Sequence, residues 1–115
     1  MKHLIANNGP TVKTASYTVT AEESGAVFIA DAVDLKFTLP SAEAGLVYTF
    51  VAGVASATTG LQVDPAAADS INDGTANKDY INTPATDAIG DSITVACDGS
   101  TWWTIAMHGI WAAEA

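Results

Sequence analysis

The sequence predicts an all-β domain: an antiparallel β-sandwich, a jelly roll or a β-tulip-like roll with very little helix. Three observations support this fold class. Short runs of alternating polar and apolar residues recur along the chain, turn-forming residues separate them by about four to six positions, and no segment shows a sustained helical period. Strands spaced so closely are typical of meanders and Greek keys rather than of βαβ units.

The clearest expected element is a hairpin near the C-terminus. Residues 92–97 alternate between apolar and small or polar side chains, which is the period of a strand. Asp98-Gly99 supplies the turn, because this pair tolerates the positive φ angles that a tight hairpin requires. A longer loop of about three to five residues, over 98–101, is the alternative.

The return strand of this hairpin carries a tryptophan on each face. Trp103, Ile105 and Met107 fall on one face and Trp102 on the other. We therefore expect one face in the core and the other against a loop or a neighbouring subunit. Trp111 follows closely, and the three rings anchor the fold. Core and subunit packing is the favoured interpretation of these side chains; an aromatic platform that stacks on sugars is the alternative.

Upstream of the hairpin, strands are expected wherever a period of two is bounded by turn residues. These strands are at residues 16–20, 26–30, 35–39 and 46–52. The second is apolar on both faces, so we expect it to be central in its sheet. Two shorter strands are expected at 61–63 and 70–72, followed by a hairpin-type turn at Asp73-Gly74 and an ordered loop over 74–88.

The length and composition predict one small domain that associates with something. Residues 1–13 are expected to form an N-terminal arm, and residues 14–115 a single β domain. The chain is 49% hydrophobic and only 15% charged, against about 25% charged in typical globular proteins. Because large exposed apolar patches are uncommon on soluble monomers, we expect an oligomer or an assembled state.

The charge balance limits the partners. Thirteen acidic residues stand against four lysines and no arginine, for a net charge of -9. This balance argues against nucleic acid and against an anionic membrane surface, since both are bound through Lys and Arg. Solubility is the simplest role for the acidity. The one cysteine, Cys97, is expected to be a buried small hydrophobe, and we expect neither a signal peptide nor a transmembrane span.

The arm holds two of the four lysines and is interrupted by the breaker cluster Asn7-Asn8-Gly9-Pro10. A frayed terminus is the simple interpretation. The sharper hypothesis is that this comparatively basic arm contacts a neighbouring protein. The residues expected to make that contact are Lys2, His3, Leu4, Ile5 and Lys13.

No catalytic, cofactor-binding or metal-ligating constellation is predicted. The two histidines, His3 and His108, lack Cys, Asp or Glu at zinc-ligand spacing, and no serine lies in a nucleophile elbow. An EF-hand loop starting at Asp69 would need a carboxylate where Tyr80 stands. We therefore expect neither an enzyme nor a cofactor. An irregular calcium site remains open, built from Asp64, Asp69, Asp73, Asp79 or Asp87.

Several motifs resemble the small β domains of tailed-bacteriophage virion proteins, which occur as head decoration proteins and within head or tail fibres. The resemblance covers roughly residues 15–111. It is carried by Ser24-Gly25-x-Val27-Phe28, Phe37-Thr38-Leu39-Pro40-x-Ala42-x-x-Gly45-x-x-Tyr48-x-Phe50, Asp69-x-Ile71-Asn72-Asp73-Gly74, Gly90-Asp91-Ser92-Ile93-Thr94-Val95, Asp98-Gly99-Ser100-Thr101-Trp102 and Gly109-Ile110-Trp111.

This resemblance implies a β fold and a virion role, and it transfers no binding residue. Such proteins commonly form trimers. Because no fibre shaft is attached, a freestanding capsid decoration protein is expected, made in the host cytoplasm and placed on the capsid surface of the virion. Its expected partners are the major capsid protein and itself, as a homotrimer. The alternative is a glycan- or receptor-binding module of a phage fibre or tail.

Overall fold

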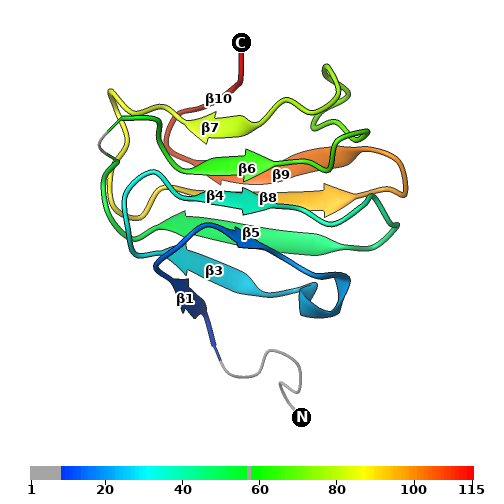
Figure 1. Ribbon diagram of the computed structural model, residues 1–115, viewed down its shortest axis with the longest axis horizontal. Helices are drawn as coiled ribbons and strands as arrows, with labels where there is room; N and C mark the ends of the chain where they lie inside the picture. The colour runs from blue at the N-terminus through cyan, green and yellow to red at the C-terminus, as the bar shows by residue number, and fades with distance from the viewer. Residues whose placement is uncertain (1–8, 57) are drawn as a thin grey trace.

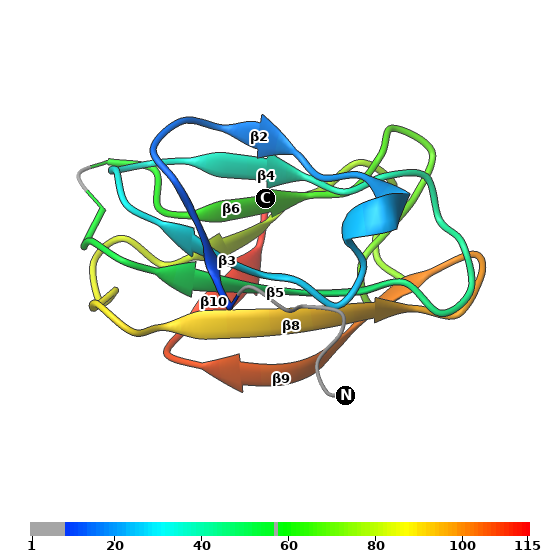
Figure 2. The same ribbon diagram turned by 90° about the horizontal axis from the view of Figure 1, so that it is seen from below.

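The computed structural model describes residues 9–56 and 58–115 as two five-stranded sheets packed face to face (Figures 1 and 2). The first sheet has the order β1 (Thr11–Lys13), β3 (Val27–Ala30), β5 (Val47–Ala52), β8 (Ser92–Cys97) and β9 (Trp102–His108). The second has the order β10 (Trp111–Ala113), β7 (Tyr80–Asn82), β6 (Gln62–Asp64), β4 (Lys36–Thr38) and β2 (Tyr17–Thr18). A single 3-10 turn, η1 (Ala21–Glu23), is the only helical element of the described residues. The predicted all-β sandwich is confirmed.

The strand directions differ from the antiparallel prediction, because both sheets are mixed. Strands β1 to β6 alternate between the two sheets along the chain, so each connection crosses the sandwich instead of folding back within one layer (Figure 2). Strands two apart in sequence therefore lie side by side and run in the same direction, as in the parallel pairs β3–β5 and β4–β6. From β6 onward the pairs β6–β7, β5–β8, β8–β9 and β7–β10 are antiparallel.

Four local expectations are corrected. Residues 11–13 of the expected arm form β1, which pairs with β3. The expected strand at 70–72 is reduced to one bridge, between Ile71 and Trp102, and the tight turn falls one residue early, at Asn72 and Asp73 with φ of 57° and 58°. The expected loop over 74–88 contains β7. Three strands of three residues each, β1, β7 and β10, were not predicted, because so short a strand shows little period in sequence.

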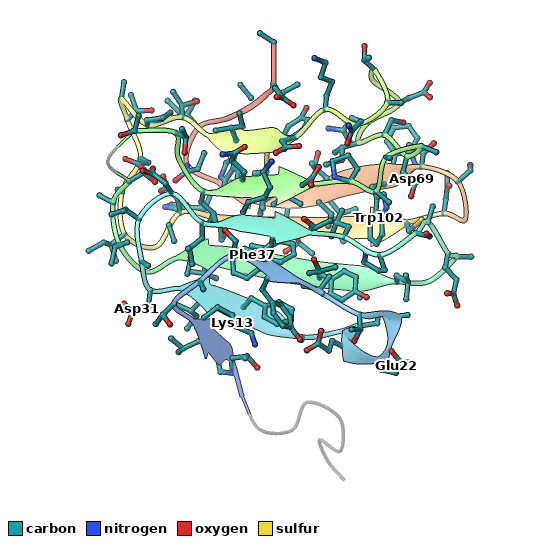
Figure 3. All side chains as sticks on the ribbon, viewed as in Figure 1. Lys13, Glu22, Asp31, Phe37, Asp69 and Trp102 are labelled. Carbon is teal, nitrogen blue, oxygen red and sulfur yellow. The ribbon has the colours of Figure 1, made fainter. Side chains whose placement is uncertain are left out.

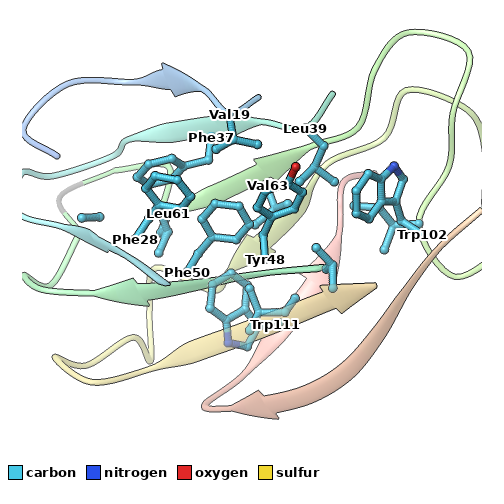
Figure 4. Close-up of a cluster of buried hydrophobic side chains, with 14 of the residues drawn as sticks. Val19, Phe28, Phe37, Leu39, Tyr48, Phe50, Leu61, Val63, Trp102 and Trp111 are labelled. Atoms are coloured by element: carbon cyan, nitrogen blue, oxygen red, sulfur yellow. The ribbon is translucent and has the colours of Figure 1, made fainter. Parts of the chain in front are cut away.

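Large aromatic residues from both sheets fill the space between the layers (Figure 4). Phe37 of the second sheet packs on Phe50 of the first, with ring centroids 5.0 Å apart. The ring centroids of Tyr48 and Trp102 lie 5.9 Å apart, and the Tyr48 hydroxyl donates a hydrogen bond to the Thr20 carbonyl. Burial raises the pKa of Tyr48 to about 12. The alternating rows of β5 and β8 thus form the core that their sequences predict.

Candidate interaction surface

The hairpin between β8 and β9 is built around one carboxylate. Asp98 accepts hydrogen bonds from the Trp103 indole N–H and from the backbone N–H groups of Ser100 and Thr101, each at 2.9 Å. These donors, the indole first, hold the pKa of Asp98 well below its usual range. The loop spans residues 98–101, which is the longer of the two predicted forms. Asp98 therefore fixes the Trp103 ring at the edge of the sandwich.

Strand β9 contains a bulge that breaks the alternation expected from its sequence. Val95 lies opposite Thr104 and Thr94 lies opposite Ala106, so Ile105 has no cross-strand partner. Trp103 shares a face with Ala96, whereas Met107 lies opposite the buried Ile93. Trp103, Ile105 and Met107 therefore do not share one face, as a regular strand would require.

The three tryptophans have different environments. Trp102 is fully buried and Trp111 is 9% exposed, with its indole N–H donating to the His108 carbonyl at 3.0 Å. Trp103 is 40% exposed. Trp102 and Trp111 are thus core residues, and Trp103 is the ring that an aromatic platform would have to use.

Exposed apolar side chains concentrate on β9 and the turn after it. Of the seven large hydrophobic side chains exposed in the described residues, four lie within 103–110; we call them the β9 edge cluster: Trp103, Ile105, Met107 and Ile110. Ile105 is 61% exposed. Residues 102–113 contain no Asp, Glu, Lys or Arg. An apolar cluster with no charged residue in its strand is typical of an interaction surface.

The backbone of β9 is covered over only part of its outer edge. Trp102 exchanges hydrogen bonds with the segment 70–72, through the Ser70 carbonyl and the Asn72 N–H. The Asn72 side-chain oxygen then accepts the Thr104 N–H at 2.9 Å. Among the described residues, no strand pairs with this edge beyond Thr104. The uncovered stretch of backbone therefore coincides with Ile105 and Met107.

The other three sheet edges are short. Strands β1 and β10 have three residues each and β2 has two, whereas β9 has seven and is the longest strand described. Short edge strands and charged residues protect β-proteins from edge-to-edge association. Lys13 lies on β1 and Glu114 follows β10. The edge at β9 has neither protection, apart from its bulge.

A second polar cluster lies on the outer side of the second sheet. Asp79 is 3% exposed, and its Oδ2 lies 3.4 Å from the Lys36 ammonium. The neighbouring Asp64 accepts a hydrogen bond from the Thr38 hydroxyl at 3.1 Å. Burial, and then the hydrogen bond and negative charge of Asp64, raise the pKa of Asp79 to about 6, while Lys36 opposes the shift. Asp79 therefore takes up a proton in mildly acidic solution.

This carboxyl pair predicts an unusual pH dependence of stability. The Asp79 pKa is about 6 in the folded protein and about 3.9 when unfolded, so the native state binds more protons between these values. The contribution of Asp79 to stability therefore falls as the pH rises from about 4 to about 6. We expect Asp79→Asn to remove this trend. The free energy of unfolding of the variant minus that of the wild type should then rise by roughly 1–3 kcal/mol between pH 4 and pH 8.

Urea unfolding followed at pH 4, 6 and 8 would measure this difference. Asp73→Asn is the matched control, because it removes one exposed carboxylate from the same part of the chain. A constant difference between Asp79→Asn and wild type across these pH values would contradict the prediction.

Of the five aspartates considered for calcium, Asp64 and Asp79 lie together, and the other three lie elsewhere. Asp69 accepts the Ala42 N–H and Asp87 accepts the Ser56 N–H, each at 2.8 Å, so each caps a different loop. Asp73 lies in the tight turn described above. Figure 3 shows Asp31 and Asp69 at opposite ends of the sandwich. Across residues 9–56 and 58–115, no group of three or more His, Cys, Asp or Glu side chains could hold a metal ion.

The expected arm residues Lys2, His3, Leu4 and Ile5 lie outside the described residues. Lys13 is described, and its ammonium lies 3.6 Å from the centroid of the Tyr17 ring. This cation–π contact ties the end of β1 to β2 of its own domain. Lys13 is therefore packed against its own domain.

Comparisons of the chain with protein-family models, with curated proteins and with solved structures gave no match. No helix within the described ranges is long and apolar enough to cross a membrane. Two site features had no warning in the sequence: the bulge at Ile105 and the pairing of Asp64 with Asp79. The Asp98-Gly99 pair did predict the turn, but not the hydrogen bond from the Trp103 indole to Asp98.

Proposed function

We propose that this protein is a capsid decoration protein of a tailed bacteriophage, which binds the outside of the assembled head and stabilises it as a homotrimer. The observation that carries the self-association is the β9 edge cluster, an uncharged apolar group on the one long sheet edge. The virion role is supported by the sequence motifs that resemble phage head and fibre domains. The major capsid protein is the second partner.

The physical basis of such a role is mass action. A protein that binds only the assembled lattice lowers the free energy of that lattice, and so stabilises it against disassembly. A trimer presents three copies of each contact, and the second and third contacts form at high effective concentration. In this proposal the β9 edge cluster joins the copies, and residues 2–5 reach the capsid from the arm.

The first experiment is the mass of the purified protein in solution. We expect light scattering to give three times the chain mass of 11.8 kDa. Ile105→Lys should reduce the mass to that of a monomer, because it places a charge at the uncovered edge. It should leave the fold intact, since Ile105 is 61% exposed.

Val33→Lys is the control for that substitution. Val33 is 49% exposed and lies between β3 and β4, away from β9, so the trimer should persist. A wild-type monomer at all concentrations, or equal behaviour of both variants, would refute the assignment of the β9 edge cluster to subunit contact.

The second candidate function is a glycan- or receptor-binding module of a phage fibre or tail. The observation that favours it is Trp103, a half-exposed ring held by Asp98, whose other carboxylate oxygen accepts the Ser100 hydroxyl at 3.3 Å. A ring fixed before binding loses little entropy when a sugar stacks on it. Adding a glycan should then change the tryptophan emission of the wild type. Loss of that change in Trp103→Phe would support this function instead.

A further inference from the structure

The outer edge of β9 is closed at one end by a side chain rather than by a strand. The backbone of Trp102 pairs with the segment 70–72 as it would with a neighbouring strand: its N–H donates to the Ser70 carbonyl at 3.0 Å, and its carbonyl accepts the Asn72 N–H at 2.7 Å. Two residues further along β9, the Thr104 N–H donates to the Asn72 side-chain oxygen at 2.9 Å. The amide oxygen therefore takes the place that a main-chain carbonyl would occupy in a longer paired strand.

The Asn72 side chain is held in this place by both sheets. Its amide nitrogen donates to the Thr104 hydroxyl of the first sheet at 2.9 Å and to the Tyr80 hydroxyl of β7, in the second sheet, at 3.0 Å. Its backbone has a φ of 57°, in the left-handed region that asparagine adopts more readily than most residues. Both the donors and the acceptor of the amide are thus used, and a neighbouring strand could reach Thr104 only by displacing them.

The end of this covered stretch coincides with the start of the exposed apolar stretch. Ile105 is the bulge residue without a cross-strand partner, and it follows Thr104 directly. An open strand edge can pair in several registers, because its backbone groups repeat every two residues. An edge whose first part is already occupied offers an incoming strand fewer places to begin.

We propose that Asn72 determines the register of the contact between copies, because it keeps a second copy from pairing with β9 at Thr104 and confines it to residues 105–108. This inference rests on the proposed function, in which the β9 edge cluster joins the copies. A contact with a single register repeats identically from copy to copy, so the assembly can close as a trimer. A contact that slides or extends along the edge gives open assemblies of mixed size.

Asn72→Gly is the variant that tests this role. Glycine adopts a φ of 57° without penalty, so the substitution removes the side chain and leaves the backbone conformation accessible. The Thr104 N–H then becomes available to a second copy. We expect light scattering to give a single trimer mass for the wild type. For Asn72→Gly we expect an average mass at least twofold higher, which increases with protein concentration.

Two further variants control the result. Tyr80→Phe removes one hydrogen-bond partner of Asn72 but leaves the Asn72 oxygen on Thr104, so its mass should equal that of the wild type. Asn72→Gly combined with Ile105→Lys should be a monomer, because the heavier species form through the same edge. In this monomeric background, the Thr104 amide should exchange its hydrogen at least tenfold faster than it does with Ile105→Lys alone.

The outcomes separate this inference from the proposed subunit contact. A wild type that is monomeric at all concentrations would overturn both. A trimer for the wild type and the same trimer for Asn72→Gly would overturn the role of Asn72 and leave the contact standing. Heavier species that persist when Ile105→Lys is added would place their contacts elsewhere, against the inference. An Asn72→Gly variant that does not fold would show that the side chain serves only to hold the segment 70–72, and would overturn the inference as well.

Discussion

Trp102→Ala is expected to destabilise the domain by about 3–5 kcal/mol, the range for a large aromatic residue deleted from a packed core. The ring is fully buried, packs against Tyr48 and lies opposite Cys97. Its backbone also holds the segment 70–72 against β9, so the neighbours cannot simply collapse into the space. Such a loss is a large part of a total stability of about 5–15 kcal/mol.

Chemical unfolding followed by circular dichroism would measure this change. Trp103→Ala is the matched control, because it removes the same side chain one residue later at a half-exposed position. We expect the control to cost about 1 kcal/mol or less. A Trp102→Ala variant that unfolds at the same denaturant concentration as wild type would show that this ring does not hold the two sheets together.

Gly60→Ala is expected to cost about 2–5 kcal/mol for two separate reasons. Gly60 has a φ of +86°, where a side chain costs about 1–2 kcal/mol. An added Cβ would also overlap the carbonyl oxygen of Asn82, and relieving an overlap with backbone costs about 1–3 kcal/mol more. Asp34 accepts the Gly60 N–H at 3.0 Å and restrains the loop from moving away.

Gly25→Ala separates the two contributions. Gly25 has a φ of +93°, but no atom lies within 4 Å of its added Cβ, so it pays for backbone conformation alone. We expect thermal unfolding to show a loss of about 1–2 kcal/mol for Gly25→Ala and about twice that or more for Gly60→Ala. Equal losses for the two variants would mean that the loop at Gly60 yields to the new methyl group.

The sequence predicts the long strands correctly. Strands β5, β8 and β9 each show a period of two, and the inward rows of β5 and β8 are the buried ones. The apolar pattern on both sides of residues 26–30 correctly places β3 inside its sheet, between β1 and β5.

Other features depend on distant parts of the chain and leave no local pattern. The parallel pairing of β3 with β5 follows from connections that cross from one sheet to the other. A short connection has the same composition whether it leads to the other sheet or back into the same sheet, so the sequence does not distinguish the two. The bulge at Ile105 is visible only in the register between β8 and β9. Likewise, Asp64 and Asp79 are brought together by the antiparallel pairing of β6 with β7.

The pairing of β5 with β8 also affects how the protein is completed on the ribosome. Residues 47–51 of β5 pair with residues 92–96 of β8, which are synthesised about 45 residues later. At about 5–20 residues per second, the nascent chain waits roughly 2–9 s with one side of β5 unpaired. This strand, whose inward row holds Tyr48 and Phe50, is therefore open to chaperones, and to other nascent chains, until the final hairpin leaves the exit tunnel.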